Sequence, residues 1–270
     1  GMIYFMISFL KNGNLLYRTM KKVLFVIPHP DDEIVGSCIL IKDFLKKKKV
    51  SIVFLTNGVI SPNTNWFWNR KNYKKEVSIR YQEMLKSLAN LDVNDFFLQD
   101  IPTRTLKSNI DKSYIYLKEI ILNKNIDTLF CPAYEGGHQD HDVANFIVSK
   151  LKSHCKVFEF PEYNFYGQTI NSNTFFYKNG TEIVIDLDNN QKLFKTKSMN
   201  IYKSEKKNLK YINLKQECFR PLVSYEYSSP PHDGVLFYRR YSLFSWHPRV
   251  DNNSPIEICN KIRNSKIFNK

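Results

Sequence analysis

A histidine and three consecutive acids stand together early in the chain, in the segment PHPDDE at residues 28–33. The apolar run VLFVI leads straight into this segment, so we expect the cluster to lie at the carboxyl end of a buried strand. Adjacent carboxylates repel one another unless something positive lies among them. A helix that begins near Pro30 would let His29 and Asp32 converge on one point. Asp31 would lie beside that point, and the converging pair would supply two of the three protein ligands of a catalytic zinc site.

A second cluster of metal-binding residue types follows the apolar run DTLFCP, in the segment AYEGGHQDHDVAN. Its candidates for the third ligand are His138, Asp140 and His141, because ligands of parallel sheets bind at the carboxyl ends of the strands. Each cluster also has an ordinary explanation, since acids at a helix start are stabilised by capping and by the helix dipole. That explanation does not account for two distant strand ends enriched in the same ligand types, so we favour a metal site.

Together, PHPDDE and GGHQDH resemble the two signatures of the PIG-L/LmbE-type zinc deacetylases, (A/P)HPDDE and HPDH. The similarity continues in LTNG, in the spacing Arg80-x-x-Glu83 and, more weakly, in KTKSMNIYKSE. The sequence departs from the family pattern at Gln139, where proline is usual, and at Glu205, where glutamine is usual. The resemblance covers roughly residues 20–205, and it implies N-acetylglucosaminyl conjugates as the substrate class.

The resemblance also implies a role for each residue of the two clusters. Three residues match the family's zinc ligands: His29, Asp32 and His141. Asp31 matches its general base. His138 matches the histidine that stabilises the oxyanion or protonates the leaving amine, and Asp140 matches the partner that orients this histidine.

Three further residues are expected to contact the substrate. Arg80 matches a family arginine that contacts substrate or a bound anion, although a salt bridge on the helix surface is an alternative. Trp66 and Trp68 lie in a loop after the second expected strand, where sugar rings can stack on indoles. A loop that buries both indoles against the core is the alternative reading of this pair. We expect substrate contact, because the loop should emerge at the same edge as the metal.

These residues predict a zinc-dependent deacetylase that hydrolyses the acetamide of an N-acetylated amino sugar in a GlcNAc-type conjugate. Zinc, or another divalent transition metal, would activate a water by lowering its pKa to about 7, with Asp31 as general base. Two alternatives stay open: a non-catalytic, metal-holding glycan-binding protein of the same fold, and a metal-dependent phosphoesterase. A binding protein has no need of an acid beside the ligands, and phosphoesterases with two metals need more bridging carboxylates.

Expected strands and helices alternate through the first half of the chain. The strands VLFVIP, VSIVFL, DFFLQD and DTLFCP are separated by helices expected over residues 34–48, 73–91 and 110–124. This alternation predicts an α/β fold, a Rossmann-like three-layer sandwich with a mostly parallel sheet.

The second half is richer in Phe, Tyr and Asn, and it predicts a C-terminal α+β extension. Within it we expect a helix over about 191–208 and a late strand in GVLFYRRYSLFSW. Residues 1–155 are expected to form the Rossmann-like metal-binding core with an N-terminal arm. Residues 156–270 are expected to pack on that core, within one structural domain overall.

The chain carries a net charge of +14, from 40 basic and 26 acidic residues. This excess favours an anionic partner, such as a small-molecule or glycoconjugate substrate or a membrane surface contacted peripherally. The alternative is that lysine-rich stretches such as KDFLKKKKV are simply solvated. We expect no nucleic-acid partner, and no apolar run approaches the ~20 residues that span a bilayer. The five scattered cysteines lack CxxC spacing, which argues against a disulfide framework and favours a cytoplasmic location.

Overall fold

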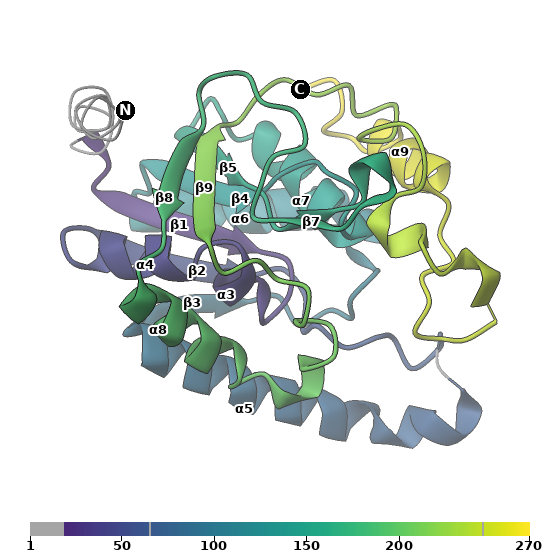
Figure 1. The fold of residues 1–270 in the computed structure, drawn as a ribbon. Helices are drawn as coiled ribbons and strands as arrows, with labels where there is room; N and C mark the ends of the chain where they lie inside the picture. The colour runs from purple at the N-terminus through teal and green to yellow at the C-terminus, as the bar shows by residue number, and fades with distance from the viewer. Residues whose placement is uncertain (1–18, 65, 245) are drawn as a thin grey trace.

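The computed structural model describes residues 19–64, 66–244 and 246–270, except for the side chains of residues 67–69. A seven-stranded sheet in the order β3-β2-β1-β4-β5-β9-β8 forms the centre of the fold (Figure 1). Its strands are β1 (Lys22–Ile27), β2 (Lys49–Phe54), β3 (Asp95–Leu98), β4 (Thr128–Pro132), β5 (Lys156–Phe160), β8 (Ile183–Asp186) and β9 (Gln216–Pro221). The first five run parallel, whereas β9 is antiparallel to both β5 and β8. A separate short pair joins β6 (Tyr163–Asn164) to β7 (Asn171–Ser172).

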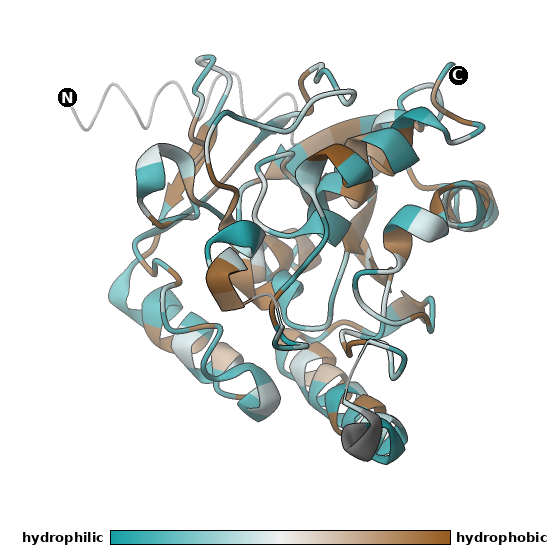
Figure 2. Cartoon of the chain, turned by 90° about the vertical axis from the view of Figure 1, so that its right-hand side faces the viewer, coloured by the Kyte–Doolittle hydropathy of each residue, from teal (hydrophilic) through white to brown (hydrophobic). Residues whose placement is uncertain are grey.

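Helices cover both faces of this sheet. They are α3 (Asp32–Val35), α4 (Cys38–Leu45), α5 (Tyr73–Leu91), α6 (Ile110–Lys124), α7 (Gln139–Ser149), α8 (Asn189–Met199) and α9 (Pro255–Arg263). Short 3₁₀ helices are η2 (Phe67–Asn72), η3 (Leu106–Ser108), η4 (Tyr166–Gln168), η5 (Lys203–Glu205), η6 (Phe237–Arg239) and η7 (Ser242–Phe244). One apolar cluster joins the sheet to α4, α5 and α8, and another joins its opposite face to α6, α7 and α9. Figure 2 shows the helices with both hydrophilic and hydrophobic residues, as expected for elements with one face toward a core.

The sequence of β1 explains its central place in the sheet. Val23, Phe25 and Ile27 belong to the first apolar cluster, whereas Leu24 and Val26 belong to the second. All five side chains are fully buried, and burying a side chain of this size contributes about 1.5–3 kcal/mol. A continuous apolar run is therefore what a strand covered on both faces requires.

The α/β fold class with a mostly parallel sheet is confirmed. The helix expected over 73–91 is present as α5 with the same bounds. The single helix expected over 34–48 is wrong, because the chain forms α3 and then α4 with a break between them. Gly36 lies at the break, where an added Cβ would come within 2.4 Å of the Phe160 ring. Close packing of the backbone against β5 accompanies the break.

Two expectations for the extension are also corrected. The helix expected to reach residue 208 ends at Met199, and it begins with a capping box formed by Asp188 and Gln191. The late strand is wrong, because its segment forms η6 and η7. Phe237 N donates a hydrogen bond to Gly136 O at 2.9 Å. The segment is thus tied to the loop after β4 rather than to an edge of the sheet.

The chain after residue 155 contributes β5, β8 and β9 to the same sheet. A buried ion pair links it to the first helices: Lys195 Nζ lies 2.7 Å from Glu217 Oε1 and donates to Val35 O at 2.8 Å. The division at residues 155 and 156 stays a prediction. Most of the expected N-terminal arm, residues 1–18, lies outside the described residues.

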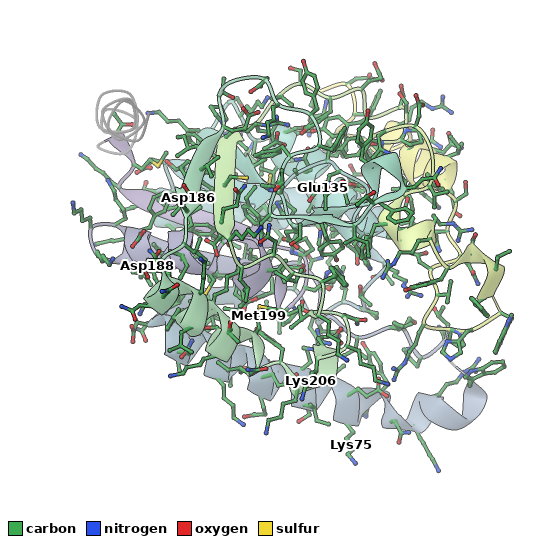
Figure 3. All side chains as sticks on the ribbon, viewed as in Figure 1. Lys75, Glu135, Asp186, Asp188, Met199 and Lys206 are labelled. Carbon is green, nitrogen blue, oxygen red and sulfur yellow. The ribbon has the colours of Figure 1, made fainter. Side chains whose placement is uncertain are left out.

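The surface carries much of the excess positive charge. Lys75 and Lys206, for example, are exposed, and Lys75 lies at the margin of the molecule in Figure 3. The five cysteines are free thiols. Within the described part of the chain, every helix is too short or too polar to cross a membrane.

Candidate metal centre and active site

The two clusters identified in the sequence meet at one edge of the sheet. β1 and β4 are parallel neighbours, and the chain leads away from them in opposite directions, from β1 to β2 and β3 and from β4 to β5. Such a switch point leaves a crevice outside the carboxyl ends of the strands, where ligands of open α/β sheets bind. His29 follows β1 and His138 follows β4, so both clusters lie at this switch point.

Three side-chain atoms form a close triangle in this crevice. His29 Nδ1 lies 2.9 Å from Asp32 Oδ2, and His141 Nε2 lies 3.1 Å from the same oxygen and 3.3 Å from His29 Nδ1. Ligands held about 2.0–2.2 Å from a tetrahedral zinc ion are about 3.3–3.5 Å apart. The three residues therefore fit a divalent metal with little movement, and their chemical types are those that zinc binds.

The surroundings of His141 support the same fit. Within the described part of the chain, His141 Nδ1 is buried without a hydrogen-bond partner, and so are both carboxylate oxygens of Glu162. Glu162 Oε2 lies 3.5 Å from His141 Nδ1. A carboxylate behind a metal-binding histidine orients the ring and raises its basicity. Sequence reasoning missed Glu162, which stands outside both motifs, just after β5.

The same neighbourhood admits two other groups of three ligand atoms within 4.8 Å of one another, one adding His138 and the other adding Glu162. Both groups contain His141, so they describe one centre rather than two. We favour the triangle of His29, Asp32 and His141, because its edges are only 2.9–3.3 Å. In addition, His138 Nδ1 already accepts a hydrogen bond from Asp140 N at 3.0 Å.

Attraction between the histidines and the aspartates of the site favours their charged forms. Burial acts to lower the pKa of His29, but Asp32 and Asp140 outweigh it and raise that pKa to about 10. Burial acts to raise the pKa of Asp32, but His141 and His29 hold it well below its usual value. Burial and the charge of Asp32 together raise the pKa of Glu162 well above its usual value.

Asp140 lies closer to His29 than to His138, the histidine that it was expected to orient. Its Oδ2 lies 2.9 Å from His29 Nε2 but 3.8 Å from His138 Nδ1. The same oxygen accepts hydrogen bonds from Thr103 Oγ1 at 3.0 Å and from Arg104 N at 2.6 Å. Asp140 is fully buried and fixed by these donors, so its carboxylate orients His29, on the side of the ring opposite to the triangle.

His138 caps α7 through its ring, and this bond determines where its proton lies. Nδ1 accepts the backbone N–H of Asp140, so the neutral ring carries its proton on Nε2. Burial and the neighbouring His29 lower the pKa of His138 well below its usual value. The ring stands edge-on to His29, with 4.4 Å between the ring centroids. His138 thus presents a hydrogen-bond donor beside the triangle.

Asp31 is buried and its backbone is strained. Its φ of 133° lies in a region that non-glycine residues rarely adopt. Glu33 Oε2 accepts the Asp31 N–H at 2.9 Å, and the other oxygen of Glu33 accepts hydrogen bonds from Ser87 and Tyr202. The Asp31 side chain makes no capping bond at the start of α3. Capping therefore does not explain why an acid occupies this position.

Neighbouring charges act in opposite directions on the pKa of Asp31. Burial and Asp32 raise its pKa well above the usual value, while Arg80 acts to lower it. Arg80 Nη1 lies 3.9 Å from Asp31 Oδ2 and donates to Pro30 O at 2.9 Å. A divalent cation at the triangle would favour the charged form of the carboxylate.

Arg80 and the two tryptophans are placed less directly at the site. The Arg80 guanidinium is buried and bonded to Glu205, and its Nε donates to Ser204 Oγ at 3.1 Å. Trp66 is half-buried in the loop before η2, and the side chain of Trp68 lies outside the described part of the structure. Their contact with substrate stays a prediction.

The extension supplies a wall that sequence reasoning missed. Tyr163 packs beside His141, with ring centroids 5.5 Å apart, and Phe237 packs on Tyr163 at 4.7 Å. Gly137 permits this approach, since an added Cβ would lie 2.3 Å from Tyr163 O. Glu135, which Figure 3 places within the body of the molecule, accepts the N–H groups of Glu162 and Tyr163 at 2.6 and 3.1 Å. The loop after β4 and the extension are therefore joined at the crevice.

Comparison with known proteins identifies the class. Residues 24–152 match the family model described as PIG-L: GlcNAc-PI de-N-acetylase. This match confirms the resemblance seen in the two motifs. The weaker similarity at residues 195–205 lies beyond the matched range.

Particular relatives are distant. The chain is 29% identical over 132 residues to "Probable N-acetyl-alpha-D-glucosaminyl L-malate deacetylase 2" of Bacillus subtilis (strain 168), a match of 47% of this chain and 58% of that protein. The zinc inhibited form of teicoplanin deacetylase Orf2 superposes with a TM-score of 0.58 and 12% identity, over 76% of this chain and 99% of that one. The 4-carboxy-2-hydroxymuconate hydratase from Pseudomonas putida KT2440 superposes with a TM-score of 0.57 and 11% identity, over 80% and 100%. At such identities the likeness to the two solved structures concerns the fold alone, and that fold carries more than one chemistry.

Proposed function

We propose that this protein is a zinc-dependent deacetylase that hydrolyses the acetamide of an N-acetylated amino sugar in a GlcNAc-type conjugate. The observation that carries the proposal is the triangle of His29, Asp32 and His141, with edges of 2.9–3.3 Å and the carboxylate of Asp31 beside it. The match of residues 24–152 to the PIG-L family model supports the same reaction, because that model is described as a de-N-acetylase.

A zinc ion held by His29, Asp32 and His141 would lower the pKa of a water to about 7 and polarise the acetamide carbonyl. Asp31 accepts the proton of the attacking water on its carboxylate. Its strained backbone is fixed by Glu33, so the acid stays beside the ligands without joining them. The carbonyl carbon gains the water oxygen and becomes tetrahedral.

His138 stabilises the negative charge that develops on the former carbonyl oxygen, because its Nε2–H is the donor left free by the bond at Nδ1. Removal of one such donor costs about 10²–10³ in rate. A neutral imidazole cannot readily give up its remaining proton, so protonated Asp31 returns its proton to the leaving amine. Breaking the C–N bond then yields acetate and the free amino sugar, and Asp31 is again a carboxylate.

The test is a panel of N-acetylhexosamine conjugates incubated with the protein, with released acetate as the readout. We expect acetate release that stops with a chelator and returns with added zinc. Bound zinc without acetate release from any conjugate would overturn the proposal in favour of a binding protein. Release of phosphate from phosphorylated conjugates without loss of acetate would overturn it in favour of a phosphoesterase. Restoration by one metal but not another, among zinc, cobalt and manganese, identifies the cofactor.

A further inference from the structure

Arg240 differs from other arginines that are enclosed in the structure. Three of them reach a carboxylate oxygen within 4.0 Å: Arg80 reaches Glu205, Arg104 reaches Asp251 and Arg220 reaches Glu159. Within the described part of the chain, half-buried Arg240 reaches none, and neither does its neighbour Arg239, whose Nη1 donates to the backbone oxygen of Asp251. Arg240 Nη1 donates to Phe237 O at 2.8 Å, and its Nε is buried without a partner among the described residues.

Aromatic rings hold this guanidinium in place. Its central carbon lies 3.5 Å from the ring centroid of Phe237, 4.5 Å from that of Tyr241 and 5.9 Å from that of Tyr211. Contacts of this kind stabilise a cation without neutralising it. A guanidinium that is fixed in orientation and keeps free N–H groups binds a carboxylate or a phosphate well, because its fork matches two acceptor oxygens.

The aromatic rings around Arg240 are connected to the candidate metal centre by ring contacts. Tyr163 contacts Phe237 on one side and His141 on the other. Tyr211 contacts both Tyr163, at 5.6 Å, and Phe237, at 5.0 Å, between ring centroids. Burial is the main cause that raises the pKa of Tyr211, but its hydroxyl also responds to Arg240 and to the carboxylates of the site. Through these ring contacts, Tyr211 connects Arg240 to Tyr163, which packs beside His141.

The wall also carries two hydroxyl groups, those of Tyr163 and Tyr211. Within the described part of the chain, the hydroxyls of Tyr163 and Tyr211 make no hydrogen bond, and neither is sealed from solvent in the way that Arg240 Nε is. Buried polar groups normally find partners. Two hydroxyls and a guanidinium on one aromatic surface are donors suited to a polar, negatively charged ligand next to a sugar.

We propose that Arg240, with Tyr163 and Tyr211, binds an anionic substituent, a carboxylate or a phosphate, on the amino-sugar conjugate whose acetamide meets the triangle. This inference rests on the proposed deacetylase function and names its substrate class. It also reassigns the cation: Arg80, the arginine expected to meet an anion, already faces Glu205. Arg240 keeps its charge uncompensated.

The test compares two kinds of substrate with one sugar. Methyl N-acetylglucosaminide is the neutral substrate, N-acetylglucosamine 1-phosphate carries a phosphate, and the N-acetylglucosaminide of glycolate carries a carboxylate. In Arg240→Gln we expect kcat/KM for the preferred anionic substrate to fall about 10–100-fold, through KM, since a hydrogen bond to a charged group contributes about 1.5–3 kcal/mol. The value for the neutral substrate should stay within about twofold. Arg240→Lys should restore part of the loss, and Arg249→Gln, at an exposed arginine in the next loop, should change neither value.

The outcomes separate this inference from the proposed function. Equal losses for neutral and anionic substrates, or no loss in Arg240→Gln, would overturn the role of Arg240. The preference between phosphate and carboxylate in the wild-type protein identifies the anion. If the wild-type protein releases acetate from none of the substrates, the proposed function fails, and calorimetric binding of N-acetylglucosamine 1-phosphate then decides on Arg240. Weaker binding by Arg240→Gln, at an unchanged unfolding temperature, would support the anion site on its own.

Discussion

The crevice has two walls that differ in how their polar groups are satisfied. On the wall formed by the strand ends, His29 contacts both Asp32 and Asp140, and His141 contacts Asp32. On the wall formed by the extension, Tyr163, Tyr211 and Arg240 present donors that no described side chain meets. The first wall has its geometry fixed by its own contacts, as the chemistry of bond cleavage requires. The second leaves its hydrogen-bonding capacity for a ligand, as recognition requires.

Removing a ligand from the first wall should have the largest effect. In His141→Ala, we expect the bound metal to be lost and acetate release to fall by at least about 10³-fold, since the metal contributes several kcal/mol to the barrier. Metal content measured by elemental analysis checks the first result and turnover checks the second. His154→Ala, at an exposed histidine, is the control and should match the wild type. Full metal occupancy in His141→Ala would refute the triangle.

Replacing Asp31 should have the second largest effect on turnover. Asp31→Asn keeps the shape of the side chain, and asparagine tolerates a positive φ better than most residues. We expect metal content to be unchanged and kcat to fall about 10²–10⁴-fold, the contribution typical of a positioned proton acceptor. If the variant instead loses its metal, Asp31 is a ligand and the division of labour between Asp31 and Asp32 is wrong.

The sequence indicated that the two clusters of the first wall would lie close together, for a physical reason. The apolar run before PHPDDE and the one before GGHQDH each predict a buried strand, and parallel strands bring their carboxyl ends to one edge. That rule alone places His29 near His141, although they are 112 residues apart. The same rule does not predict contacts that depend on the direction of a side chain. Asp140 lies closer to His29 than to His138, and no spacing in the sequence indicates that difference.

The second wall could not be predicted in the same way. Its residues come from segments with no regular period, and the one strand expected there proved to be η6 and η7. Tyr163 reaches His141 because Gly137 leaves space for its backbone, which is a tertiary contact rather than a local preference. The abundance of Phe and Tyr after residue 156 was visible in the sequence, but it indicates a packed extension as readily as a binding surface.

The third prediction concerns the attachment of the extension to the core, which is tested by the free energy of unfolding. Lys195→Met leaves Glu217 buried without its cation, and breaking a buried pair in this way costs about 3–5 kcal/mol. Denaturant unfolding should show that loss, whereas Lys197→Met, at an exposed lysine of the same helix, should change the free energy of unfolding by less than about 0.5 kcal/mol. A loss under about 1 kcal/mol in Lys195→Met would mean that the pair does not hold the extension to α3 and α4.

Glu162 lies where the two walls meet, and it gives the smallest and most discriminating effect. It belongs to the extension by sequence, but its carboxylate stands 3.5 Å behind His141. Glu162→Gln retains the size of the side chain and replaces its carboxyl group with an amide. If Glu162 orients His141, metal affinity should weaken about 10–100-fold, and kcat at saturating metal should change far less, because no reacting atom is touched. Titration of the apoprotein with zinc against a competing chelator measures the affinity, with Glu182→Gln as the control for loss of a carboxylate elsewhere in the extension. A fall in kcat at saturating metal without a change in affinity would place Glu162 among the groups that touch the substrate, and the boundary between the two walls would then lie closer to the triangle.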